Sequence, residues 1–225
     1  MTHERPAPAL PPAAHPGVLA LVGSGEYLPA MQPVDRYLLG LLDGPAQVVC
    51  LPTAAGTEGS ARIAYWSRLG EQHFRGLGAA VQAVPVIDRA SANDEALAGV
   101  IRQANFVYLS GGKPDYLYRT LQDTPVWEAI QAVLGRGGVL AGCSAGAMIL
   151  GERLPGFPAP GLGQRVFGLL PGTVIMPHFD EIPAAFTRAL RGLVGRLALV
   201  GIDGNTALVS TGGRFSVVGT GRVVV

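Results

Sequence analysis

The chain has 225 residues, of which 48% are hydrophobic and 15% are charged, and its formal net charge is +1. This composition excludes an extensively disordered chain, and it argues against a nucleic-acid binder that depends on neutralising phosphates. No apolar run approaches the roughly 20 residues that a membrane span needs, and the N-terminus lacks the order of a signal peptide. We therefore expect a cytoplasmic protein whose two cysteines, Cys50 and Cys143, are free thiols.

The N-terminal segment differs in composition from the rest of the chain. Residues 1–17 are mostly Pro and Ala, which is typical of a flexible tail. The length of the remainder suits one domain, and no internal repeat is present. We expect a single folded domain over residues 18–225.

Short apolar runs alternate with helical stretches along most of this domain. The apolar runs, each closed by small or turn-forming residues, lie at 18–22, 47–51, 80–86, 106–109 and 138–142. The helical stretches lie at 31–42, 57–76, 94–103, 115–121 and 126–136. This alternation predicts right-handed βαβ crossovers and a doubly wound, mostly parallel sheet flanked by helices, as in flavodoxin-like folds.

The end of the chain has a different pattern. Runs at 207–210, 214–218 and 222–225 are separated by glycine-rich turns. Such spacing predicts that the α/β fold finishes with antiparallel strands.

The turn after residue 142 has the pattern of a nucleophile elbow. Gly142-Cys143-Ser144-Ala145-Gly146 fits G-x-S-x-G, in which small residues two positions either side of the serine allow a tight strand-to-helix turn. The same pattern centred on Cys143 would place Ala141 and Ala145 where the turn needs glycine. The sequence thus favours Ser144 as the nucleophile, although a helix-capping serine has the same pattern.

A serine nucleophile needs a general base. The chain has four histidines, of which His3 and His15 fall in the expected tail and His73 falls in a helical stretch. His178 follows the apolar run 173–176 and should stand at a strand end, on the same edge of the sheet as Ser144. An imidazole in that place can accept the hydroxyl proton.

The oxyanion of the reaction needs two hydrogen-bond donors. One candidate is the backbone N–H of Ala145, which directly follows the nucleophile at the start of a helix. The second is the N–H of Gly111 or Gly112, since glycine lets the backbone approach a substrate closely.

Several blocks of the sequence resemble the S51 serine peptidases, which include dipeptidase E and cyanophycinase and have the class I glutamine amidotransferase-like fold. The blocks are "LVGSGE" from Leu21, "YLSGGKPDYL" from Tyr108, "GCSAGAMIL" from Gly142, "PHF" from Pro177 and "GIDGNTAL" from Gly201. They occur in the family's order and extend from near residue 18 to the C-terminus. The resemblance implies the same nucleophile, base and oxyanion donors, small peptide substrates, no metal, no cofactor and a homodimer.

The acid that would orient His178 is not settled by the resemblance. Cyanophycinase-like sequences continue the Gly-Ile-Asp block with Glu, and Gly204 stands there instead. Asp180 is favoured, because His178-Phe179-Asp180 resembles the His-x-Glu of glutamine amidotransferases, and Asp203 is the alternative. Glu152 is the one acid between the nucleophile and the base, where dipeptidase E has its acid.

Other polar residues on the predicted edge are candidates for substrate binding, namely Glu26, Lys113 and Asp115. Glu26 and Asp115 are equally suited to capping the helices that follow them. Met176 and Pro177 replace the Asp-Gln pair that cyanophycinases have before the catalytic histidine, so cyanophycin is not the expected substrate.

The sequence therefore predicts a serine-type peptidase that hydrolyses small peptides through an acyl-enzyme on Ser144. Two alternatives stay open. One is a catalytically weakened protein of the same fold that binds or senses a small molecule, and the other is an amidohydrolase that uses Cys143.

Overall fold

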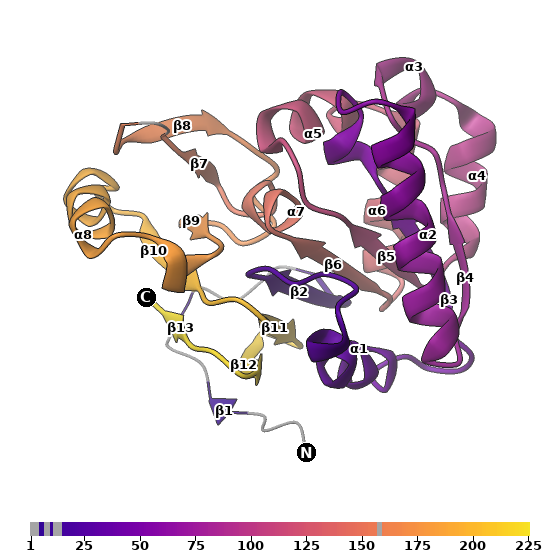
Figure 1. The fold of residues 1–225 in the computed structure, drawn as a ribbon, viewed down its shortest axis with the longest axis horizontal. Helices are drawn as coiled ribbons and strands as arrows, with labels where there is room; N and C mark the ends of the chain where they lie inside the picture. The colour runs from indigo at the N-terminus through magenta and orange to yellow at the C-terminus, as the bar shows by residue number, and fades with distance from the viewer. Residues whose placement is uncertain (1–4, 7–9, 11–14, 157–158) are drawn as a thin grey trace.

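The computed structural model describes residues 5–6, 10, 15–156 and 159–225. A mixed eight-stranded sheet forms its centre (Figure 1). In spatial order its strands are β1 (Arg5–Pro6), β12 (Arg214–Gly219), β11 (Thr206–Thr211), β2 (Val18–Val22), β6 (Val139–Cys143), β5 (Phe106–Leu109), β3 (Gln47–Leu51) and β4 (Ala80–Ala83). The strands from β2 to β4 in this order run parallel, and β11 and β12 join them by antiparallel pairing. The predicted mostly parallel sheet with C-terminal antiparallel strands is confirmed.

Helices cover both faces of this sheet. They are α1 (Gln32–Leu39) and α2 (Ser60–Gly76) on one face, and α3 (Arg89–Ala92), α4 (Glu95–Gln103), α5 (Pro114–Leu121) and α6 (Pro125–Gly135) on the other. Alternate strand residues serve the two faces: Leu19 and Leu21 pack in the cluster of α4 and α6, whereas Ala20 and Val22 pack with Phe74 of α2. Burial on both faces explains why these strands are continuous apolar runs.

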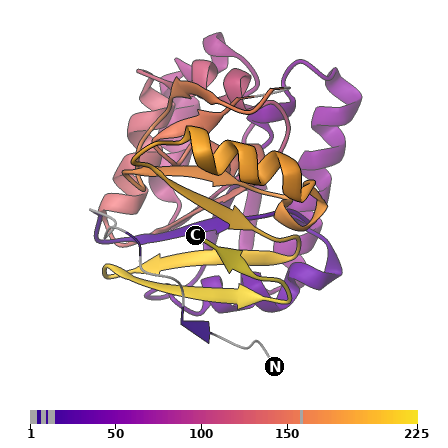
Figure 2. The ribbon, with the colours of Figure 1, turned by 90° about the vertical axis from the view of Figure 1, so that its left-hand side faces the viewer.

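A second, five-stranded sheet was not predicted. Its strands, in spatial order, are β13 (Val223–Val224), β10 (Ala198–Ile202), β9 (Thr173–Met176), β7 (Arg153–Pro155) and β8 (Leu162–Arg165). Helix α8 (Ala184–Leu193) lies across its outer face, where Leu190 packs on Val174 and Met176 (Figure 2). Ile175 and Val200 point the other way and join the core of the first sheet. The two sheets therefore share one apolar core.

Short helices complete the fold at the strand ends. They are α7 (Ala145–Met148) and the 3₁₀ turns η1 (Pro29–Met31), η2 (Thr53–Ala55) and η3 (Phe179–Glu181). Both α7 and η3 begin directly beside residues that the sequence singles out, Ser144 and His178.

The expected flexible tail, residues 1–17, lies largely outside the described residues. Within it, Arg5 and Pro6 pair with Val217 and Ser216 of β12.

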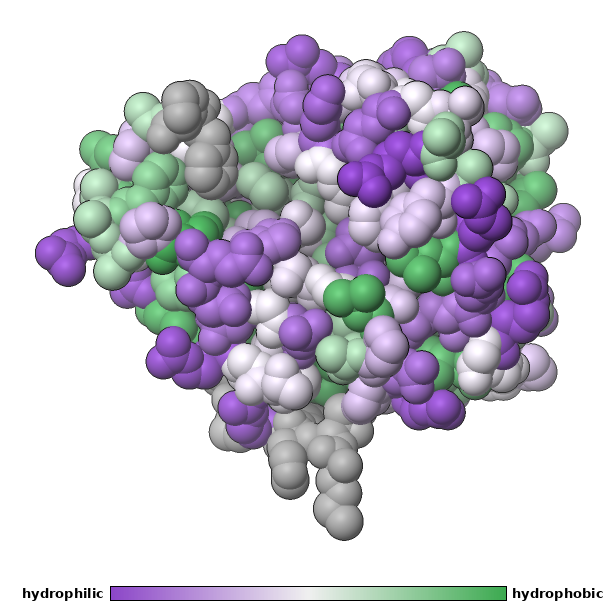
Figure 3. Space-filling model, viewed as in Figure 1, coloured by the Kyte–Doolittle hydropathy of each residue, from purple (hydrophilic) through white to green (hydrophobic). Residues whose placement is uncertain are grey.

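Apolar side chains gather at the upper left of the surface in Figure 3, where Figure 1 draws β7 and β8. None of the helices in the described part of the chain has the length and apolar content of a membrane span.

Candidate active site

Ser144 occupies a strained turn between β6 and α7. Its backbone has φ 51° and ψ −111°, a conformation that costs a non-glycine residue free energy and is typical of functional turns. The turn closes only because its flanking residues are glycines. A Cβ on Gly142 would lie 2.4 Å from the carbonyl oxygen of Gly146, and a Cβ on Gly146 would lie 2.5 Å from the carbonyl oxygen of Leu109. The N–H of Ser144 donates to the carbonyl of Val22 at 3.0 Å, which fixes the turn to the neighbouring strand.

His178 stands opposite Ser144, at the end of β9 in the second sheet. Its backbone is left-handed, with φ 51° and ψ 36°, a region that histidine enters more readily than most residues. Phe179 anchors this turn by packing directly on the backbone of β10, because a Cβ on Gly201 would lie 2.3 Å from the Phe179 ring. The result is a distance of 3.1 Å between Nε2 of His178 and Oγ of Ser144.

Three carboxylates lie near His178 in the sequence or the fold, and each has a different partner. Asp180 accepts the backbone N–H of Gly204 at 2.8 Å. Asp203 accepts the backbone N–H of Arg222 at 2.9 Å. Glu181, which the sequence analysis did not select, places Oε1 3.4 Å from Nδ1 of His178. Among the described contacts of His178, the carboxylate facing Nδ1 is therefore that of Glu181.

The spacing of Glu181 explains this contact. In a 3₁₀ turn the side chains at positions i and i+3 eclipse one another, and η3 places Glu181 three residues after His178. The Glu181 side chain is 67% exposed. Glu152 lies elsewhere, accepting the backbone N–H of Gly172 at 2.8 Å.

Glu26 is buried behind Ser144 rather than exposed toward the cavity. Its Oε1 accepts the N–H of Gly111 at 2.9 Å, and its Oε2 accepts the thiol of Cys143 at 3.0 Å. Gly111 lies beside Ser144, since a Cβ on it would be 3.3 Å from Cβ of Ser144. The Glu26 carboxylate thus joins the loop after β5 to the turn after β6.

The hydrogen bond from Gly111 to Glu26 distinguishes between the candidate oxyanion donors. The N–H of Gly111 is already directed to Glu26, whereas the N–H groups of Gly112 and Ala145 have no acceptor within the described residues. Gly112 has φ 142°, which orients its N–H differently from that of an ordinary residue.

The Cys143 thiol is placed apart from the cavity. Its side chain is fully buried and donates to Glu26, and burial raises the pKa of Cys143 well above its ordinary value, with the nearby carboxylate adding to the effect. A thiol in this environment is protonated at neutral pH and is a poor nucleophile.

Lys113 and Asp115 lie on the rim but do not line the cavity described below. The ammonium of Lys113 donates to Oγ1 of Thr57 at 2.9 Å. Asp115 is in the first turn of α5 and is exposed.

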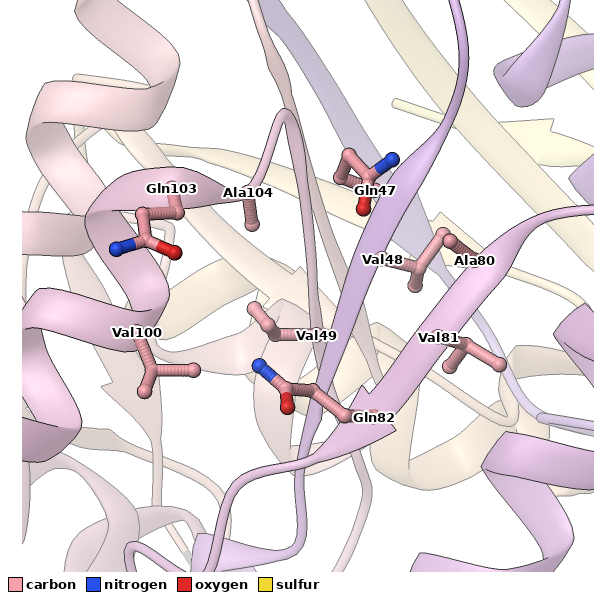
Figure 4. A pocket seen from close by; sticks show the side chains of 9 residues that line it. All are labelled: Gln47, Val48, Val49, Ala80, Val81, Gln82, Val100, Gln103 and Ala104. Carbon is pink, nitrogen blue, oxygen red and sulfur yellow. The ribbon is translucent and has the colours of Figure 1, made fainter.

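A cavity of about 320 Å³ opens at the Ser144–His178 pair. Its other lining residues are Met148, Met176, Pro177, Glu181 and Ile182. A second cavity of about 250 Å³ lies between β3, β4 and α4, where the side chains of Gln47, Gln82 and Gln103 approach it (Figure 4). None of the described residues that line this second cavity is an acid, a base or a nucleophile, so the chemistry-bearing residues belong to the first. In the described part of the chain, no group of three or more His, Cys, Asp or Glu side chains is arranged to hold a metal ion.

Comparisons with known proteins identify the family and the fold. The profile of the family described as Peptidase family S51 matches residues 19–218. The crystal structure of a peptidase from an acI-B1 Actinobacterium is similar at a TM-score of 0.83 and 37% identity, over 94% of this chain and 91% of that one. A putative peptidase E protein from Listeria monocytogenes EGD-e shares the fold at a TM-score of 0.65 and 18% identity, over 91% of this chain and 99% of that one. No curated protein sequence matched.

Proposed function

We propose that this chain, which belongs to peptidase family S51, hydrolyses small peptides through an acyl-enzyme on Ser144, with His178 as the general base. The observation that carries the proposal is the 3.1 Å separation of Ser144 Oγ and His178 Nε2, within the range needed for proton transfer. The strained turn of Ser144 supports it, because it presents the hydroxyl at the mouth of a cavity. The cavity volume, about 320 Å³, is near the lower end for ligand pockets and suits a short peptide.

The proposed reaction follows from these contacts. His178 Nε2 accepts the proton of Ser144 as Oγ attacks the scissile carbonyl, and the N–H groups of Ala145 and Gly112 stabilise the oxyanion. The imidazolium then protonates the leaving amine, which departs and leaves an ester on Ser144. Water, deprotonated by the same imidazole, hydrolyses this ester and restores the enzyme.

Glu181 is the proposed orienting acid. A neutral His178 that accepts at Nε2 carries its proton on Nδ1, and the Glu181 carboxylate lies 3.4 Å from that nitrogen. Catalytic hydrogen bonds are often long before substrate binds, so this distance is compatible with the role. Asp180, which the sequence favours, and Asp203, its alternative, are bonded instead to backbone N–H groups of Gly204 and Arg222.

The test is labelling by a fluorophosphonate probe together with hydrolysis of a dipeptide library. Ser144→Ala should abolish labelling and lower kcat by about 10⁶-fold, and His178→Gln should weaken both strongly. Ser67→Ala is the matched control, because Ser67 bonds to a carbonyl within α2 away from the site. Labelling that persists in Ser144→Ala, or a folded protein with neither labelling nor turnover, would contradict the proposal. The second result would favour a binding protein of the same fold.

A further inference from the structure

The walls of the cavity beside Ser144 are apolar. Met148 lies four residues after Ser144 at the end of α7, on the same side of this short helix as the nucleophile. Met176 ends β9, and Ile182 follows η3, so the three side chains approach the cavity from three different elements. Met148 and Met176 are both buried. Apart from the catalytic pair, the cavity thus offers mainly carbon and sulfur atoms to a substrate.

The charged groups of the cavity also bear on which substrates it can bind. Among the described residues that line it there is no Lys or Arg, and the ionisable group beside the catalytic pair is Glu181. A substrate carboxylate here would lose hydration against methionine and isoleucine without gaining a cation. It would also lie near the like charge of Glu181. An apolar side chain loses no hydrogen bond in the same place and gains contact with the methionines, whose flexible thioethers adapt to different shapes.

We propose that the residue flanking the scissile bond has an apolar side chain of leucine or methionine size, bound against Met148, Met176 and Ile182. This inference rests on the proposed function, since it assigns a substrate class to the same site. It distinguishes the chain from an enzyme that selects an acidic residue beside the scissile bond.

The experiment measures kcat/KM for two series of dipeptides, X–Ala and Ala–X, in which X is Leu, Met, Ala, Asp or Lys. In at least one series we expect Leu and Met to exceed Asp by on the order of 100-fold, and to exceed Ala by about 10-fold or more. A preference for Asp or Lys in both series, or a flat profile in both, would overturn the inference. Fluorophosphonate labelling of the same preparation reports separately on Ser144, so labelling with the wrong profile overturns only the substrate class.

A pair of variants tests the wall directly. Ile182→Arg places a cation at the cavity, and the ratio of kcat/KM for Asp over Leu should rise by about 10-fold or more. Val100→Arg changes another half-buried aliphatic residue, on α4 at the second cavity (Figure 4), and should leave that ratio unchanged. Equal ratios in Ile182→Arg and the wild type would count against the assignment of this wall. If Ile182→Arg does not fold, the wild-type profile decides the question.

Discussion

At the scale of single residues, Glu26 connects the loop after β5 to the turn that holds Ser144. One carboxylate oxygen accepts the N–H of Gly111 and the other accepts the thiol of Cys143. The carboxylate is buried, with 8% of the residue exposed, so its contacts are with the protein rather than with a bound peptide. The sequence predicted a substrate-binding or capping role for this residue, and the structure places it behind Ser144.

Glu26→Gln should therefore lower kcat more than it changes KM. The amide keeps one acceptor for Gly111 but turns an NH₂ group toward the Cys143 thiol, which shifts the turn of Ser144. We expect kcat to fall about 10- to 100-fold with KM within about twofold, in steady-state assays on a dipeptide substrate. Glu71→Gln is the control, because Glu71 also accepts a backbone N–H, from Ala83, but away from the site. A raised KM with unchanged kcat would instead indicate contact with the substrate.

The two thiols give a second prediction at this scale. Burial raises the pKa of Cys143 well above its ordinary value and that of Cys50 to about 12. Thiolate is the reactive form, so the folded protein should resist iodoacetamide at neutral pH and keep its activity. Mass spectrometry of tryptic peptides checks this, with the urea-unfolded protein as the positive control. Rapid alkylation of Cys143 with loss of activity would instead support the alternative in which Cys143 is the nucleophile.

The candidate site could be predicted from the sequence only in part. Glycines at 142 and 146 centre the turn on Ser144 because a Cβ at either position would meet a backbone carbonyl, and this is a local property. The carboxylate that faces His178 cannot be predicted from neighbouring residues in the same way. It depends on a left-handed residue followed by a 3₁₀ turn, which together direct Glu181 rather than Asp180 toward the imidazole. No sequence pattern predicts that geometry.

At the scale of elements, a buried hydrogen bond between two side chains joins α1 to α2. Nε2 of His73 lies 2.8 Å from Oδ2 of Asp35, and both side chains are almost inaccessible to solvent. Burial raises the pKa of Asp35, and the hydrogen bond and charge of His73 oppose this rise. Because the folded state then holds the Asp35 proton more tightly than the unfolded state, ionisation of this carboxyl weakens stability as pH rises through its folded pKa.

His73→Leu should leave the Asp35 carboxyl buried without its partner. We expect a loss of about 3–5 kcal/mol in the free energy of unfolding at neutral pH, measured by urea denaturation. The loss should shrink on acidification, where Asp35 is protonated in both states and no buried charge is left unpaired. The double variant Asp35→Leu/His73→Leu should recover much of it, since an apolar pair carries no desolvation cost. A pH-independent loss would point to packing of the ring rather than to its contact with the Asp35 carboxyl.

The elements that the sequence predicts are those with strong burial. Strands β3 and β5 have the bounds expected from their apolar runs, because both faces of each strand are covered by helices. The expected strand over 80–86 ends at Ala83, before Pro85, which has no N–H to donate to the sheet. Strands β7 and β8 were not predicted, because they are short and β8 is Leu-Gly-Gln-Arg, which has no apolar alternation.

At the scale of the whole molecule, the proposed catalytic pair draws one residue from each of the two sheets. Ser144 follows β6 of the first sheet, and His178 follows β9 of the second, so their 3.1 Å contact depends on how the sheets meet. The sheets join where β10 leads into β11. There the N–H of Asp203 donates to the carbonyl of Arg222, and the Asp203 carboxylate accepts the N–H of Arg222, which leads into β13. The sequence predicts that residues 222–225 form an antiparallel strand together with the runs that became β11 and β12. In the structure β13 pairs with β10 of the other sheet instead, a long-range contact. The predicted homodimer and cytoplasmic location stay predictions.

Asp203 and Glu181 should consequently differ in what they control. Asp203→Ala removes a buried hydrogen bond between the β10–β11 and β12–β13 connections, both of which pass from one sheet to the other. We expect it to cost about 1–3 kcal/mol, or a Tm lower by about 3–10 °C in a chain of this size, while kcat falls only a few-fold. Glu181 is 67% exposed, so Glu181→Ala should leave Tm within about 1 °C. Its kcat should fall by about 100-fold, less than the 10⁴-fold known for a buried orienting aspartate, because solvent screens the Glu181 carboxylate. Thermal denaturation and steady-state kinetics on the same preparations separate the two effects. If instead Asp203→Ala abolished turnover at unchanged Tm while Glu181→Ala remained active, the orienting acid would be Asp203, and the sheets would have to close further on substrate binding to bring it to His178.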